Sequence, residues 1–232
     1  MEKLCYVLWK PSGRSGPDFA RALVEEAAPA LVATGAAKLS VLAVDAEAES
    51  VQAARLTRLS DPLAGMVGLW LDCVDDRGSF EARLRPHVAR LAGYLVTESV
   101  PRRNETHRAP PGTRTPGITM LACLERPARL PQAEWIALWH ERHTPLANEI
   151  QCTYRYVRNV VVRALTPGAP PWAGLVEEGF PTAAITDPAR WYRAEGNPEK
   201  LRENRSRMLA SVKQFLDIDR VESHPMGEWV MR

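Results

Sequence analysis

The sequence predicts an α+β fold made of two similar halves, each with the element order β-α-β-β-α-β. The first observation behind this prediction is a constant spacing between landmark residues. Three landmarks recur 116 positions later, as Pro11 and Pro127, Phe19 and Trp135, and Pro29 and Pro145. In each half they mark the end of a first apolar segment, the helical segment that follows, and the end of that helical segment. Similarity at a fixed offset indicates a repeated structural unit, and this element order is the split βαβ of ferredoxin-like folds.

The second observation is the order of the apolar segments, which matches in the two halves. In the first half we expect strands at Leu4–Trp9, Lys38–Val44 and Tyr94–Val100, a strand that begins near Ala64, and a helix at Ser79–Leu91. In the second half we expect strands at Ile118–Leu124, Tyr154–Leu165, Gly174–Phe180 and Phe215–Val221, and a helix at Pro198–Val212. Short β-rich runs between turn residues are typical of strands.

The third observation is a break in composition between the halves. Residues 101–116 hold four arginines among prolines, glycine and threonines, with almost no aliphatic residue, which is typical of a linker. We therefore predict a first half at 1–100, a linker at 101–116 and a second half at 117–232. A four-stranded sheet with both helices on one side leaves its other face bare. The two sheets are expected to pack against each other around a shared barrel-like interior within the one chain.

The composition narrows the classes of function. The chain has 232 residues and a formal net charge of +2, which does not favour nucleic acid or an anionic membrane as a partner. No apolar run approaches the roughly 18 residues of a spanning helix. The four dispersed cysteines favour reduced thiols in a cytoplasmic protein over a disulfide framework or a zinc site. No motif of serine hydrolases, Rossmann dehydrogenases or P-loop proteins occurs, so their chemistry is not expected.

The helical segment at 135–147 carries the most unusual residues. Trp135 and Trp139 recur at helical spacing, and His143 follows Trp139 by four positions on the same apolar face. Burial favours the neutral imidazole, which can act as a general acid or base near neutral pH. The alternative is a buried histidine bonded to a backbone carbonyl. At the offset of 116, Ala27 stands in place of His143, so only the second half is expected to hold a polar functional site.

Part of this segment carries a family resemblance. Residues 139–147 read Trp-His-Glu-Arg-His-Thr-Pro-Leu-Ala and resemble the W-x-x-x-H-x-P-L-A signature of EthD-domain proteins, within the dimeric α/β-barrel superfamily. Tyr156–Asn159 and Gly174–Phe180 also fit that family. The resemblance covers roughly residues 117–222, and the first half resembles a degenerate copy. The implied fold is a dimeric α/β barrel formed by the two halves of one chain.

The resemblance also implies a site. EthD-like proteins include accessory proteins of ether degradation and fungal dehydratases that act on polyketide aromatics. The implied site is the barrel interior near the end of the helix, with His143 as the acid or base and His140 at its boundary. Tyr154 and Tyr156, two positions apart, are expected to share one strand face. The residues expected to contact a substrate are Trp139, Tyr154, Tyr156, Arg158 and Asn159.

We therefore expect a cofactor-independent enzyme that acts on a small hydrophobic, aromatic or polyketide-like molecule by dehydration or a related proton transfer. The alternative is a non-catalytic protein that binds such a ligand or serves an oxygenase pathway, since an apolar pocket with one polar anchor suits both roles. His140 and His143 could also meet at a metal or a haem iron, but no third ligand at a familiar spacing is evident, and neither cofactor is expected. Two fused halves are compatible with a monomer or a homodimer.

Overall fold

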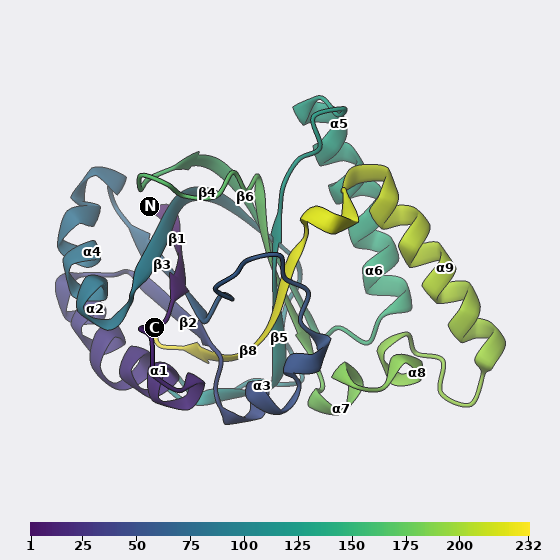
Figure 1. Ribbon diagram of the computed structural model, residues 1–232, viewed down its shortest axis with the longest axis horizontal. Coiled ribbons are helices and arrows are strands. Elements are labelled where there is room, and N and C mark those ends of the chain that lie inside the picture. Colours follow the sequence, from purple (N-terminus) through teal and green to yellow (C-terminus); the bar gives the residue numbers. More distant parts are fainter.

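The computed structural model describes all 232 residues and has the predicted α+β architecture. Two βαββαβ halves follow one another along the chain. Their eight strands close into one barrel, and the main helices lie outside it in two groups on opposite sides (Figure 1). The predicted fold class is confirmed: the chain forms an intramolecular dimeric α/β barrel.

The first half supplies four strands and one helical layer. Its strands are β1 (Glu2–Trp9), β2 (Lys38–Ala43), β3 (Gly65–Leu71) and β4 (Arg90–Arg102). The helical segment between β1 and β2 comprises α1 (Gly16–Ala22), the π-helical turn η1 (Leu23–Ala27) and α2 (Ala28–Thr34). The shorter elements are α3 (Ala46–Ser50), η2 (Gln52–Ala54), η3 (Val74–Arg77), α4 (Gly78–Leu84) and η4 (Arg85–His87). The predicted helix at Ser79–Leu91 is therefore shorter than expected, because Pro86 falls in a 3-10 turn and β4 already begins at Arg90.

The second half repeats this order, with one longer helix before its last strand. Its strands are β5 (Arg114–Leu124), β6 (Arg155–Ala164), β7 (Gly174–Phe180) and β8 (Glu222–Val230). The helical segment between β5 and β6 comprises α5 (Gln132–Ala137), the π-helical turn η5 (Leu138–His143) and α6 (Thr144–Ile150). The remaining elements are α7 (Thr182–Ile185), α8 (Pro188–Trp191), α9 (Pro198–Phe215) and η6 (Ile218–Arg220). None of the helices is long and apolar enough to cross a membrane.

The prediction of a last strand at Phe215–Val221 is wrong. Phe215 is the final residue of α9, and the last strand is β8, which begins only at Glu222. The apolar pattern missed β8 because this strand buries Glu222, His224 and Glu228. A strand that places ionisable side chains inside a barrel does not show the apolar alternation that sequence patterns detect.

The barrel closes through two seams between the halves. Its strand order is β1-β3-β2-β8-β5-β7-β6-β4, and β4 pairs with β1 to complete the ring. Within this order β2 pairs with β8 and β4 pairs with β6, both antiparallel, so each seam joins one half to the other. Closure leaves no strand edge unpaired. Because β4 extends to Arg102 and β5 starts at Arg114, only residues 103–113 of the predicted linker lie outside the strands.

Each strand divides its side chains between the barrel interior and a helical layer. On β1, Leu4 and Tyr6 belong to the core under the first-half helices, whereas Cys5 and Val7 belong to the core inside the barrel. This is the two-residue alternation of a β-strand. Both faces of β1 are buried, which explains why its sequence is apolar almost throughout.

The two helical layers differ in how they pack. Figure 1 shows α1, α2 and α4 on one side of the barrel, and α5, α6 and α9 on the other. The first-half layer forms a cluster of 21 buried residues, whereas the corresponding second-half cluster has 11. The long helix α9 begins after Asn197, whose side chain accepts a hydrogen bond from the Lys200 amide. Pro198 occupies the first turn, where proline is favoured. The second half therefore leaves room under its helices.

Candidate functional site

A cavity of about 600 Å³ lies between the sheet of the second half and the helices that cover it. Fourteen of its 20 lining residues are hydrophobic. Ala122 of β5 and Val176 of β7 contribute to the sheet side, and α9 forms the opposite wall. Figure 1 shows α9 on the outer side of β5, and both elements contribute lining residues. The expectation of a site in the barrel interior is therefore corrected: the cavity lies on the outer face of the sheet.

α9 provides the apolar wall because its large side chains recur at helical spacing. Met208, Val212 and Phe215 line the cavity together with Leu209. Residues three and four positions apart share one face of a helix, so these four side chains form a continuous stripe. Met208 and Phe215 are buried, which fixes the helix against the rest of the half.

His143 reaches the cavity from the π-helical turn η5. Its Nδ1 lies 3.1 Å from the Ser211 hydroxyl of α9, and its ring packs on Phe215 with 4.7 Å between the ring centroids. The other ring nitrogen, Nε2, has no hydrogen-bond partner in the chain and is not among the fully buried unpaired atoms. Burial lowers the pKa of His143 to about 4. The imidazole is therefore neutral near pH 7, with Ser211 holding one nitrogen and the other free.

Glu178 is a cavity residue that the sequence analysis did not select. It follows Glu177 on β7, and strand alternation sends the two carboxyl groups to opposite faces of the sheet. Glu178 lines the cavity, whereas Glu177 contacts residues inside the barrel. Burial raises the pKa of Glu178 to about 7. The pairing of two adjacent glutamates on a buried strand is the sequence signal that could have revealed one carboxyl on each face.

Tyr156 and Trp139, two of the residues expected to contact a substrate, both line the cavity. Tyr156 of β6 stands directly opposite Glu178 in the antiparallel pair of β6 and β7, so the two side chains are neighbours on one face. Burial and the Glu178 carboxylate both raise the pKa of the Tyr156 phenol. Trp139 packs against Trp135 with 5.0 Å between centroids, and its indole N–H has no partner in the chain.

His140 and Arg158 lie outside the cavity lining and connect η5 to the sheet. Arg158 donates to the Ser99 hydroxyl of β4 at 3.0 Å and to the His140 carbonyl at 3.3 Å. The His140 ring meets Trp139 edge-on, with 4.9 Å between centroids. Burial and the nearby Arg158 charge lower the pKa of His140 to about 4. Both residues therefore hold the helical segment in place.

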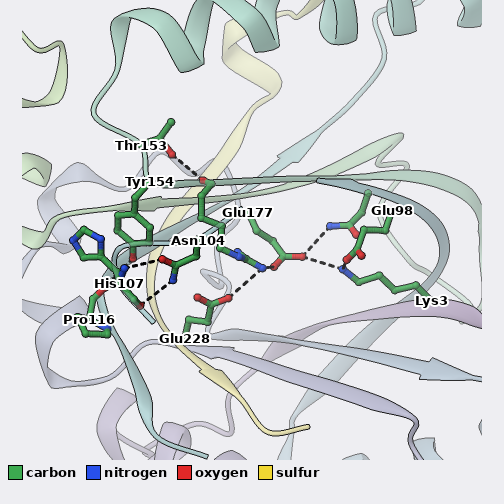
Figure 2. A network of polar contacts seen from close by, with 11 residues as sticks. Lys3, Glu98, Asn104, His107, Pro116, Thr153, Tyr154, Glu177 and Glu228 are labelled. Atoms are coloured by element: carbon green, nitrogen blue, oxygen red, sulfur yellow. Dashed lines mark hydrogen bonds and ion pairs between the residues drawn. The ribbon is translucent and has the colours of Figure 1, made fainter. Parts of the chain in front are cut away.

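Asn159 and Tyr154 belong to the barrel rather than to the cavity. Asn159 donates to the Glu177 carboxylate at 3.0 Å inside the barrel. Tyr154 precedes β6 and donates to the Pro116 carbonyl at 2.9 Å, with its ring stacked on His107. Figure 2 shows Tyr154 beside His107 and Pro116, and Tyr154 is not among the residues that line the cavity. The expectation that Tyr154 and Tyr156 share one face is therefore corrected, because the regular strand begins only at Arg155.

The first half has no equivalent of this polar arrangement. Both halves contain a π-helical turn at the same place, η1 and η5, and such turns often occur at functional sites. In η1 the position of His143 is taken by Ala27, which is fully buried in the first-half core. The same backbone conformation thus holds a buried core residue in the first half and the His143 imidazole in the second.

No group of three or more His, Cys, Asp or Glu side chains is placed to hold a metal ion. His140 and His143, whose meeting at one metal was the alternative that the sequence did not favour, make different contacts. His143 lines the cavity and contacts Ser211, whereas Nε2 of His140 is buried without a partner and is not part of the lining.

Comparisons with known proteins identify the fold. Neither a protein-family model nor a curated protein sequence matches the chain. Among solved structures the chain is similar to an anthrone oxidase-like protein, with a TM-score of 0.56 and 10% identity over 99% of this chain and 92% of that one. It is also similar to a "putative monooxygenase" of Lactobacillus acidophilus NCFM, with a TM-score of 0.51 and 7% identity over 99% of this chain and 96% of that one.

These similarities are similarities of fold. They agree with the closed barrel of the structure.

Proposed function

We propose that the second half binds a small hydrophobic, aromatic or polyketide-like molecule in this cavity and transfers a proton on it without a bound cofactor. The reaction class is a dehydration or a related step. The observation that carries the proposal is the presence of His143 and Glu178 in one apolar cavity. One is a neutral imidazole and the other a carboxyl that titrates near pH 7. Perturbed titratable groups in a mostly apolar cavity are candidates for acid–base chemistry.

The two groups can perform complementary halves of a dehydration. His143 takes a proton from a carbon beside a carbonyl, and the electron pair of that C–H bond moves toward the carbonyl oxygen. Tyr156 donates a hydrogen bond to this oxygen. Protonated Glu178 then gives its proton to the departing hydroxyl on the next carbon, so that a double bond forms and water leaves. The imidazolium and the carboxylate exchange protons with solvent to restore the starting state.

The starting protonation states agree with this division of roles. Burial disfavours the charged form of each group, so His143 is held as the base and Glu178 as the acid. Activity should therefore be highest between about pH 4 and about pH 7. It should fall above this window as Glu178 loses its proton, and Glu178→Gln should lack that alkaline limb.

The comparisons support the class of ligand. Anthrone, which appears in the description of one similar structure, is a three-ring aromatic ketone, and an apolar cavity of about 600 Å³ is in the usual range for small-molecule sites. The EthD resemblance of residues 139–147 agrees with this, because that family includes fungal dehydratases of polyketide aromatics.

A deuterium-exchange assay tests the proposed proton transfer. The protein is incubated in D₂O with a panel of hydroxylated aromatic ketones, and exchange beside the carbonyl and loss of water are followed by mass spectrometry. The wild type should accelerate one panel member, and His143→Ala should lose about 10²- to 10⁴-fold of that rate. His87→Ala is the matched control, since His87 lies in η4 and faces Glu26 of the first half. Full activity of a folded His143→Ala variant would refute the mechanism.

A ligand-binding or accessory protein of an oxygenase pathway is the second candidate, favoured by the predominance of hydrophobic residues in the lining. Native mass spectrometry followed by denaturation separates the possibilities. A carrier would retain or bind an organic molecule but turn over no panel member. A released mass that matches haem or a metal ion would overturn the cofactor-free chemistry.

A further inference from the structure

Arg205 is the one basic side chain on the apolar wall of the cavity. It lines the cavity and precedes Met208 by three positions and Leu209 by four, so it shares the cavity-facing stripe of α9. Its side chain is exposed and forms no ion pair within the chain, whereas Arg207 of the same helix pairs with Glu149 at 2.7 Å. The cavity wall therefore presents a free guanidinium.

No carboxylate of the cavity neutralises this cation. Glu178 is the only carboxyl among the lining residues, and the shift of its pKa arises from burial alone, without a contribution from Arg205. Tyr192 also lines the cavity; burial raises the pKa of its phenol and the nearby Arg205 charge lowers it. A ligand at this end of the cavity thus meets a positive charge beside a hydroxyl group.

Part of the cavity rim is apolar, and Leu209 lies one helical turn from Arg205. Leu56, Leu209 and Ile218 are among the few large hydrophobic residues that the protein exposes, at 56%, 47% and 42%. All three line the cavity. Exposed apolar surface at the mouth of a cavity indicates a binding surface. Combined with one unpaired guanidinium, it suits a ligand with a flat apolar body and an anionic group at one end.

The spacing between Arg205 and His143 fits a molecule of two or three rings. Ser211, which contacts His143 at 3.1 Å, lies six residues after Arg205 on α9. Six residues correspond to about 9 Å along a helix axis. A fused aromatic body of that length can contact Arg205 at one end and His143 at the other.

We propose that the molecule bound here is an aromatic carboxylic acid, held by a salt bridge from Arg205 beside the Tyr192 hydroxyl, with its far end at His143. The inference rests on the proposed function for the location of the ligand. It adds the acidic class of the ligand and the residue that selects for it.

Isothermal titration calorimetry with two probes of equal shape tests this inference. Anthracene-2-carboxylate and its primary amide differ in charge and share the same three-ring body. The wild type should bind the acid about 10-fold or more tightly than the amide. Arg205→Gln should weaken binding of the acid by about 10- to 100-fold and leave the amide unchanged. Arg202→Gln is the matched control, because Arg202 is exposed on the same helix and does not line the cavity.

Two results would overturn this inference but not the proposed function. One is equal affinity of the wild type for the acid and the amide, and the other is an Arg205→Gln variant that binds the acid as tightly as the wild type does. In both cases ligand binding in the cavity, and hence the proposed function, would stand. Failure of the wild type to bind either probe would overturn the inference together with the cavity on which it rests.

Discussion

Replacement of Lys3 by methionine tests whether the charges inside the barrel stabilise the contact between the two halves. Lys3 of β1 donates to Glu98 of β4 at 2.5 Å and to Glu177 of β7 at 3.3 Å. The side chains of Lys3 and Glu177 are 3% and 0% exposed. This ion pair therefore joins the first half to the second across a buried interior.

The surrounding charges decide the effect of the substitution. Figure 2 shows the polar contacts that run from Lys3 through Glu177 toward Glu228. Arg155 lies 2.7 Å from Glu177 and 3.1 Å from Glu228. Burial alone would raise the pKa of Glu177, but Lys3 and Arg155 together lower it to about 2. Without Lys3, Arg155 would be the only cation left for two buried carboxylates.

The expected loss of stability follows from this imbalance. Removal of one partner from a buried ion pair costs about 3–5 kcal/mol. Glu98 is 26% exposed and can be hydrated, so we expect the lower end of this range, about 3 kcal/mol, for Lys3→Met. The double variant Lys3→Met/Glu177→Gln removes one cation and one carboxylate together and keeps the contact between Arg155 and Glu228. It should therefore lie within about 1 kcal/mol of the wild type.

Urea unfolding at pH 7, followed by circular dichroism and extrapolated linearly to water, measures these differences. Lys38→Met is the matched control, because Lys38 is an exposed lysine of β2 that lies over the Trp70 ring without an ion pair. It should change the stability by less than about 0.5 kcal/mol. A Lys3→Met variant as stable as the control, or a double variant less stable than Lys3→Met, would contradict the reasoning.

Three further predictions concern the cavity. Relative to the wild type, Glu178→Gln should gain up to about 3 kcal/mol as the pH rises from 4.5 to about 7. The folded carboxyl keeps its proton across this window and the unfolded one loses it, so urea midpoints at pH 5 and pH 8 check the sign. Phe215→Ala should cost about 3 kcal/mol and raise the pKa of His143, as seen by NMR titration, because it removes the ring that packs on the imidazole. Gly174→Ala should cost about 1–3 kcal/mol in thermal unfolding, since its Cβ would lie 2.7 Å from the Trp139 ring.

Much of the fold could be predicted because the repeated landmark residues and the apolar strand segments are visible within short stretches of the sequence. The predicted strand at Gly174–Phe180 has the observed bounds. β8 was missed because its interior face carries buried ionisable residues such as Glu228. Their burial depends on Arg155, which lies more than 70 positions earlier in the chain. Pairings of that kind are set by the closed barrel and leave no periodic pattern in either segment.

The candidate site could be predicted only in part for a related reason. Helical spacing placed Trp139 and His143 on one face, and both line the cavity. The cavity itself could not be located from the sequence, because it forms between α9 and the sheet and depends on how these elements pack. Asn159 was grouped with Tyr156 through a shared motif, yet the strand sends these side chains to opposite faces, Asn159 to the barrel network and Tyr156 to the cavity.

β7 carries one residue of the ion-pair network inside the barrel, Glu177, and one residue of the cavity, Glu178. Glu177 and Glu178 are consecutive, so the backbone that fixes one also fixes the other. Glu177 is held from three directions by Lys3, Arg155 and Asn159, and the last two belong to β6. The same two strands carry Tyr156 opposite Glu178 on the cavity side. The contacts that hold Glu177 inside the barrel thus give the polar groups of the cavity a rigid support.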